Sequence, residues 1–227
     1  MTHSHLTVRE NHTRKLHKKR AQVADKRELI LKRAMRLFAD AGFHAARMDD
    51  LAADLGIAKG SIFQHFGSKQ GLFLEVYKLA ARSLPSYLDA PHEVRNQGFF
   101  EVLKYWLERT HHLVREDWVP YRICLLGNYG TDLSIKREVN RFLRAEDPDG
   151  TLAFVKFGWQ RAELRTDVDA EMLVSILDGM MQLFQDALLV EELDPGMFRR
   201  SGTTAEKKEE RILQFLDVLR RAIGASR

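Results

Sequence analysis

A short segment of the chain, residues 58–66, carries side chains that suit hydrogen bonding to the edges of nucleic-acid bases. The amide of Gln64 can pair bidentately with adenine, and the ammonium of Lys59 can reach guanine or a phosphate. Ser61 and His65 can hydrogen-bond phosphates, which fixes position without reading a base sequence. Gly60 would let the backbone come close to a partner. Each polar residue also has the ordinary interpretation of a solvated side chain, so the case depends on the elements that hold them.

Catalytic and metal-binding chemistry has weaker support. The paired carboxylates Asp49 and Asp50 are chain neighbours, which point about 100° apart on a helix and do not form an acid/base couple. The imidazoles of His111 and His112 are adjacent in the same way. Cys124 lies in an apolar run and is interpreted as a small core residue. We therefore expect no enzyme, no metal site and no cofactor.

The composition is that of an ordinary soluble protein, with 44% hydrophobic and 30% charged residues among 227. A single cysteine excludes an intramolecular disulfide and favours a reducing cytoplasm, and no run of about 18 uncharged apolar residues is present to span a membrane. Although the net charge is only +4, basic residues gather between Arg9 and Arg27. Such a block is expected to be a flexible arm that either touches a polyanion or only solubilises the chain.

Helical periodicity dominates the pattern, and alternating runs typical of strands are missing. Within residues 48–66, the small Ala52 would let two short helices cross closely, and Gly56 would supply the positive φ of the turn between them. Apolar residues would seat both helices on a third, at Leu51, Leu55, Ile57, Ile62 and Phe66. This is the helix-turn-helix arrangement, whose second helix enters the DNA major groove. The plainer interpretation is a generic pair of short helices in a bundle.

Residues 28–73 resemble the N-terminal domain of the TetR family of transcriptional regulators. The matching positions are Leu37-Phe38, Gly42-Phe43, Leu51-Ala52, Gly56–Phe66, Ser68-Lys69 and Leu72-Phe73, with a weaker likeness over residues 158–169 and at Gly179. The resemblance implies an all-α fold, in which a three-helix helix-turn-helix DNA-binding domain precedes a helical domain for ligand binding and dimerisation. It also implies a homodimer on a palindromic operator in double-stranded DNA, acting as a repressor that an unknown small molecule releases.

The expected organisation is an arm over residues 1–24, the DNA-binding domain over 25–82 and the C-terminal domain over 83–227. Lys69 begins the helix after the motif, where an ammonium beside a helix N-terminus would clamp a phosphate. The predicted DNA-binding residues are Arg47, Lys59, Gly60, Ser61, Phe63, Gln64, His65 and Lys69.

Three positions depart from the family pattern. Phe63 stands where the family usually has Tyr, which removes a hydroxyl that would bind a phosphate. Arg47 and Ala58 each replace a hydroxyl residue that would cap a helix. These departures keep open an alternative function, a small-molecule or protein-binding module on the same fold that has lost operator recognition.

Apolar stripes in the C-terminal half predict either a single-chain core or a dimer interface, of which we favour the interface because operator and protein symmetry go together. The predicted interface residues are Leu173, Ile176, Leu177, Met180, Phe184, Leu188, Ile212, Phe215, Leu216 and Leu219. Aromatic residues between Phe99 and Trp159 are expected to form core, pocket wall or both. The predicted ligand-pocket residues are Trp106, His111, Trp118, Tyr121, Arg122, Phe154 and Phe157.

Overall fold

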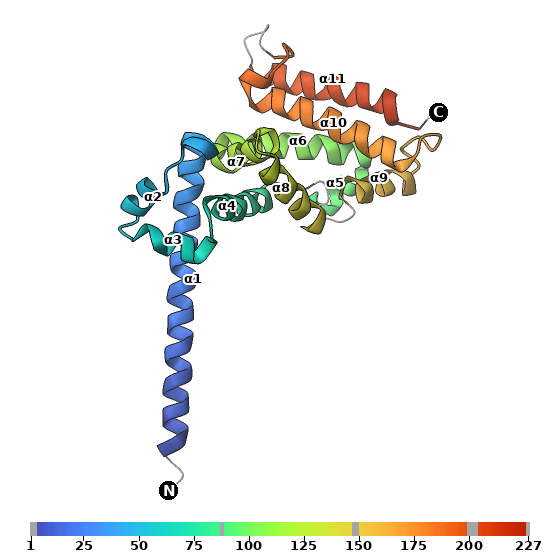
Figure 1. The fold of residues 1–227 in the computed structure, drawn as a ribbon. Helices are drawn as coiled ribbons and strands as arrows, with labels where there is room; N and C mark the ends of the chain where they lie inside the picture. The colour runs from blue at the N-terminus through green and yellow to red at the C-terminus, as the bar shows by residue number, and fades with distance from the viewer. Residues whose placement is uncertain (1–3, 87–88, 147–149, 199–203, 226–227) are drawn as a thin grey trace. The chain divides into compact units, whose positions relative to one another are not determined.

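The structure is a computed structural model that describes residues 4–86, 89–146, 150–198 and 204–225. Over these ranges the chain is helical, as expected, and the β-type pairing is an isolated bridge between Leu164 and Gly224. The helices in chain order are α1 (Ser4–Ala45), α2 (Met48–Asp54), α3 (Lys59–Phe66), α4 (Lys69–Ser83), α5 (His92–Gln97), α6 (Phe99–Glu116), α7 (Trp118–Tyr129), α8 (Leu133–Glu146), α9 (Gly150–Gln160), α10 (Ala170–Leu189), the 3-10 turn η2 (Glu191–Leu193) and α11 (Ala205–Ile223) (Figure 1).

Helix α1 replaces most of the flexible arm expected over residues 1–24, because the backbone is helical from Ser4 onward. No glycine or proline occurs before Gly42 to interrupt the helix. The side chains of residues 4–24 and the whole of residues 1–3 lie outside the described part of the chain. Gly42, with φ 75° and ψ 169°, breaks the helical geometry near the end of α1, where the sequence predicted a stop.

The described chain divides into two compact units, residues 1–81 with 119–139, and residues 82–118 with 140–227. The domain boundary expected after residue 82 agrees with the end of the first segment of the first unit. It leaves out residues 119–139, which contain most of α7 and the start of α8 and also belong with the first unit. Three contacts account for this. Tyr77 Oη donates a 3.0 Å hydrogen bond to Asn128 Oδ1, and Arg122 Nε donates to the Ala39 carbonyl. A Cβ on Gly127 would lie 2.5 Å from the Tyr77 ring, so only glycine lets α7 approach α4 this closely.

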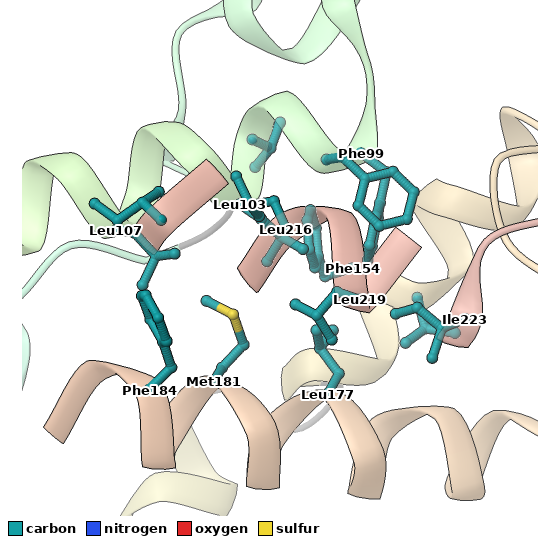
Figure 2. Close-up of a cluster of buried hydrophobic side chains, with 14 of the residues drawn as sticks. Phe99, Leu103, Leu107, Phe154, Leu177, Met181, Phe184, Leu216, Leu219 and Ile223 are labelled. Atoms are coloured by element: carbon teal, nitrogen blue, oxygen red, sulfur yellow. The ribbon is translucent and has the colours of Figure 1, made fainter. Parts of the chain in front are cut away.

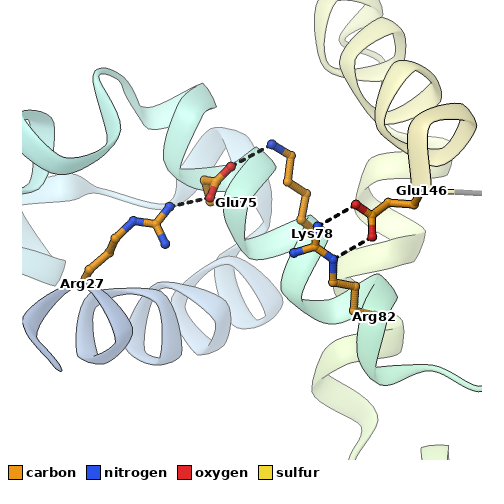
Figure 3. Close-up of polar contacts among 5 residues, drawn as sticks. All are labelled: Arg27, Glu75, Lys78, Arg82 and Glu146. Carbon is orange, nitrogen blue, oxygen red and sulfur yellow. Dashed lines mark hydrogen bonds and ion pairs between the residues drawn. The ribbon is translucent and has the colours of Figure 1, made fainter. Parts of the chain in front are cut away.

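The first unit has an aromatic core in which Phe38 of α1 and Phe73 of α4 meet edge to face at 5.2 Å. An ion-pair cluster lies beside it: Glu75 Oε2 is 2.5 Å from Arg27 Nη2, and Glu75 Oε1 is 2.8 Å from Lys78 Nζ (Figure 3). Arg27 also lies over the Phe66 ring at 5.1 Å. Arg27 thereby contacts both α3 and α4 from α1.

The second unit is built around side chains of α6, α9, α10 and α11 (Figure 2). Phe99 stacks on Phe154 with ring centroids 4.2 Å apart, and Phe184 stacks on Phe215 at 4.0 Å. The helix expected over residues 92–116 is split by Gly98, whose φ is 130° and whose added Cβ would lie 2.6 Å from Glu163 Oε2. In the same unit Arg82 forms a bidentate pair with Glu146, with N···O distances of 2.9 and 2.7 Å (Figure 3).

By length and composition, helix α10 is apolar and long enough to cross a membrane. Its packing in the second unit accounts for much of this apolarity, because it contributes Leu173, Leu177 and Phe184 to the core. Two large apolar side chains of α10 remain in solvent, Met172 at 52% and Leu183 at 57% exposure.

This packing corrects the predicted dimer interface. Seven of the ten residues are buried inside their own chain: Leu173, Leu177, Phe184, Leu188, Ile212, Leu216 and Leu219. Three are partly buried against the same core: Ile176, Met180 and Phe215. A wide apolar stripe reaches several neighbours, and the sequence does not say which neighbour covers which position.

Candidate nucleic-acid interface

Helices α2 and α3 and the turn between them form a compact corner on α1 and α4. The N–H groups of Gly56 and Ile57 donate to the Ala53 and Ala52 carbonyls at 3.1 and 3.0 Å, which closes α2 into the turn. Gly56 has φ 60°, the left-handed conformation expected for it. Ala52 is buried, as close crossing of two helices requires. Ile62 and Phe66 are buried at the same corner, so one side of α3 is fixed by packing.

The opposite side of α3 is open. Lys59, Gly60 and Gln64 are exposed, whereas Ser61 and His65 are partly buried. Phe63 is also partly buried. A Cβ on Gly60 would meet no atom within 4 Å, so packing inside the chain does not require glycine there. The exposed side of α3 therefore presents a long cation, an amide and a bare stretch of backbone, which are groups that suit a groove of DNA.

One of the charged side chains on α3 forms an ion pair within the chain. Lys59 Nζ lies 2.9 Å from Asp49 Oδ2, an exposed ion pair between α3 and the first turn of α2. Exposed pairs of this kind contribute little to stability, so Lys59 can exchange Asp49 for a phosphate or a base at small cost. Arg47 is exposed immediately before α2.

Neither helix of the motif has a side-chain N-cap. Arg47 and Ala58 occupy the N-cap positions of α2 and α3 with extended backbone and no capping hydrogen bond. This agrees with the loss of the two capping hydroxyls inferred from the sequence. Helix α3 keeps a backbone contact instead, since Ser61 N donates to the Ala58 carbonyl at 2.9 Å.

Lys69 has a role in the chain that the sequence did not predict. Its Nζ donates a 2.9 Å hydrogen bond to the His44 carbonyl and lies 5.1 Å from the centre of the Phe43 ring. Partial burial lowers the pKa of Lys69. Ser68 caps α4 by accepting a 3.0 Å hydrogen bond from Gly71 N. The ammonium therefore ties the start of α4 to the end of α1, and two of its three N–H groups stay available to an anion.

Sequence reasoning missed Arg27 and Arg33 as supports of the motif. Arg27 holds Glu75 and covers Phe66, while Arg33 Nε lies 3.6 Å from Asp54 Oδ2 at the end of α2. Both arginines belong to α1 and point toward the helices of the motif. Their partners lie far away in the sequence, so no local spacing could have identified them.

The predicted ligand-pocket residues do not form a single site. Phe154 and Phe157 line a cavity of about 350 Å³ in the second unit, together with His92, Arg95, Asn96, Val102 and Arg161. His111 lines a different groove, and Trp106 donates from Nε1 to the Pro85 carbonyl at 2.9 Å. Tyr121 and Arg122 belong to the first unit, and Trp118 is partly buried at the start of α7. The aromatic composition indicates which part of the chain contains pocket residues. It does not indicate which face of its helix each aromatic residue occupies.

Among the described residues, no group of three or more His, Cys, Asp or Glu side chains is placed to hold a metal ion. His112 and Glu116 are four residues apart and 3.3 Å from each other, which makes an exposed pair. Cys124 is buried, and burial raises the pKa of its thiol to about 12. A thiol in this setting is a core group and not a nucleophile.

Comparison with known proteins agrees with this geometry. The family profile described as "bacterial regulatory proteins, tetR family" matches residues 30–76, from the buried part of α1 to the middle of α4. The transcriptional repressor AcnR of Corynebacterium diphtheriae is 27% identical over 163 residues, which cover 72% of this chain and 80% of that protein. The transcriptional activator FasR of Mycolicibacterium smegmatis is 28% identical over 115 residues, covering 51% of this chain and 52% of that protein.

Solved structures share the fold beyond the matched segment. A TetR transcriptional regulator from Chloroflexus aurantiacus superimposes with a TM-score of 0.63 and 20% identity, over 91% of this chain and all of that one. The likeness in fold therefore extends beyond residues 30–76 and into the second unit.

Proposed function

Because the chain belongs to the TetR family of bacterial regulatory proteins, whose members act by binding DNA and not by catalysis, we propose that this DNA-binding regulator is a ligand-released repressor. It binds a palindromic operator as a homodimer. The proposal rests on the exposed side of α3. Lys59, Gly60 and Gln64 are exposed to solvent there, while the other side of the helix is packed against the rest of the first unit. A recognition helix needs one side that is packed against its own domain and one side that is exposed to the DNA.

Repression, as opposed to activation, is supported by the share of this chain that the named repressors match. AcnR proteins, named as repressors, match about 70% of this chain, whereas the activator FasR matches 51%. The proposed cytoplasmic location follows from the same function, because a regulator of this type must reach DNA.

The homodimer is supported by the solvent-exposed side of α10. Met172, Gly179 and Leu183 are exposed and lie on one side of the helix, because steps of seven and four residues return to nearly the same direction. A Cβ on Gly179 would meet no atom within 4 Å, which leaves room for the close approach of a second helix. Leu213 and Val218 add exposed apolar surface on α11. We propose that a second copy covers this surface, in place of the interface predicted from the sequence.

The release step is assigned to the cavity of about 350 Å³ lined by Phe154 and Phe157. Its lining combines these two aromatic rings with two cations, Arg95 and Arg161. Arg161 Nη2 donates to the Asn96 carbonyl at 2.9 Å and its Nε to Glu163 Oε1 at 2.5 Å, so its guanidinium is held in position. A small molecule with an apolar body would fit such a cavity.

Selection from random duplex DNA with the full-length chain at moderate salt tests the proposal. The expected result is an enriched palindrome whose half-sites lie about one helical turn apart. Binding to the selected duplex should fall steeply with salt concentration, because each phosphate contact releases counterions. Failure to enrich any sequence would favour the alternative, a binding module on this fold that has lost operator recognition.

A further inference from the structure

A groove between α6 and α11, within the second unit, is lined mostly by charged and polar side chains of both helices. Its volume is about 1000 Å³. The lining residues are Glu108, His111, His112, Arg115 and Glu116 of α6 and Ala205, Lys208, Glu209 and Ile212 of α11. The two helices run antiparallel, because Arg220 near the end of α11 lies 4.8 Å from the ring of Phe100 at the start of α6, while Lys208 lies opposite His111.

Three buried side-chain atoms lack a hydrogen-bond partner among the described residues, and all three occur on this helix pair. They are Thr110 Oγ1, His111 Nδ1 and Arg211 Nε. Thr110 is only 1% exposed, so solvent does not satisfy its hydroxyl. Buried polar groups are nearly always paired, and leaving one unpaired costs about 1–3 kcal/mol. Of these three residues His111 lines the groove, so its Nδ1 is the unpaired atom that a bound partner in the groove could reach.

The electrostatics show what kind of partner fits. Among the described residues, no ion pair holds Lys208 or Arg115 of the groove, whereas Lys207, the neighbour of Lys208, lies 3.7 Å from Glu210. Burial lowers the pKa of His111, and the nearby charges that add to this effect, Lys208, Arg115 and His112, are all positive. Burial and then Arg115 lower the pKa of Lys208 in the same direction. The charged groups that act on the pKa of His111 are therefore all cationic.

Three carboxylates also line the groove, those of Glu108, Glu116 and Glu209. Glu108 contacts Lys104 at 3.9 Å, and burial and the charge of Glu209 raise its pKa. Glu116 is paired with His112 at 3.3 Å. None of these acids is among the groups that shift the pKa of His111 or Lys208.

We propose that the groove between α6 and α11 binds an anion, a carboxylate or a phosphate group, which accepts hydrogen bonds from His111, Arg115 and Lys208. The site is separate from the cavity assigned to the releasing ligand, which is lined by residues of α5, α6 and α9 and by Arg161 after α9. An oxyanion offers several lone pairs, so it can satisfy donors that converge from two helices.

Titration of the full-length chain with sodium sulfate tests the proposal, with ionic strength held constant by sodium chloride. Sulfate keeps its charge across the neutral pH range, so binding is not confused with titration of the ligand. The expected results are a saturable rise in melting temperature and a saturable shift of the His111 ring protons in NMR spectra, assigned with His111→Gln. Sodium acetate and sodium phosphate, titrated in the same way, distinguish the natural chemistry, since the tighter of the two probes identifies a carboxylate or a phosphate ligand.

The double variant Arg115→Gln/Lys208→Gln should bind sulfate at least about ten-fold more weakly, which corresponds to losing charge-assisted hydrogen bonds. The matched control is Arg109→Gln/Lys207→Gln, which removes the same charge from the same two helices but outside the groove. It should bind as the unmodified chain does. An equal, unsaturable response of all three proteins would overturn the proposal, because general salt effects on stability do not depend on these positions. No step uses DNA, so failure here leaves the proposed function untouched.

Discussion

Gly60 separates the requirements of folding from those of DNA binding. Its position in α3 is open to solvent and its added Cβ would meet nothing. Gly60→Ala should raise the free energy of unfolding by about 0.5–1 kcal/mol, because alanine loses less conformational freedom in a helix. It should also weaken operator binding, because the methyl group would stand between the helix backbone and the groove. Urea unfolding and fluorescence anisotropy with the selected duplex measure the two effects. A stabilised protein with unchanged operator affinity would show that the backbone of α3 stays away from the DNA.

Gln64 is the exposed side chain of α3 best able to read a base. Gln64→Ala should cost about 1–3 kcal/mol of binding free energy at one operator position and relax the preference there. Lys69→Ala is the comparison, because a phosphate contact contributes equally on every duplex. Binding to a set of single-base operator variants measures both. If Gln64→Ala weakened all duplexes equally, Gln64 would contact only the backbone of the DNA.

At the scale of elements, the pair α6 and α11 should make stability depend on pH. Burial and nearby positive charges lower the pKa of His111 from 6.5 to about 4. The unfolded chain then binds more protons than the folded chain between these two values, so the free energy of unfolding falls as the pH falls through this range. His111→Gln should flatten part of that decline in urea unfolding between pH 6.5 and 4. His112→Gln, an exposed neighbour on the same helix, is the control. Equal slopes for His111→Gln and the unmodified chain would contradict the prediction.

The elements that local chemistry specifies were predictable from the sequence. The corner formed by α2 and α3 needs a small residue and a positive φ, and Ala52 and Gly56 supply both within a few residues of each other. The membership of α7 in the first unit was not predictable, since the bond from Tyr77 to Asn128 joins residues 51 positions apart. Helix α11 shows the same limit. Its apolar stripe predicted burial correctly, but amphipathicity is identical whether the covering surface belongs to the same chain or to a second copy.

At the scale of the whole molecule, a palindromic operator requires two recognition helices related by two-fold symmetry. A single chain supplies one α3. The interface of a two-fold dimer uses the same patch on both copies, so each apolar residue at its centre counts twice. Leu183, at 57% the most exposed of the large apolar side chains described on α10, is therefore a sensitive position.

Leu183→Glu should convert a dimer into a 26.3 kDa monomer, because it would bring two carboxylates into an apolar contact. The fold of each chain should survive, since the side chain is largely outside the core, and circular dichroism should stay helical. Operator affinity should fall because the two half-sites would be bound independently. The matched control is Leu133→Glu, a leucine of 65% exposure on α8 that should leave the dimer intact.

Light scattering of the purified proteins measures the mass, and anisotropy measures binding to full operators and to half-sites. The monomeric variant should bind a half-site as well as the unmodified chain does, since α3 is untouched. A dimer that withstands Leu183→Glu would place the interface elsewhere, and a variant that loses half-site binding would show that the α10 surface supports the fold of the chain itself.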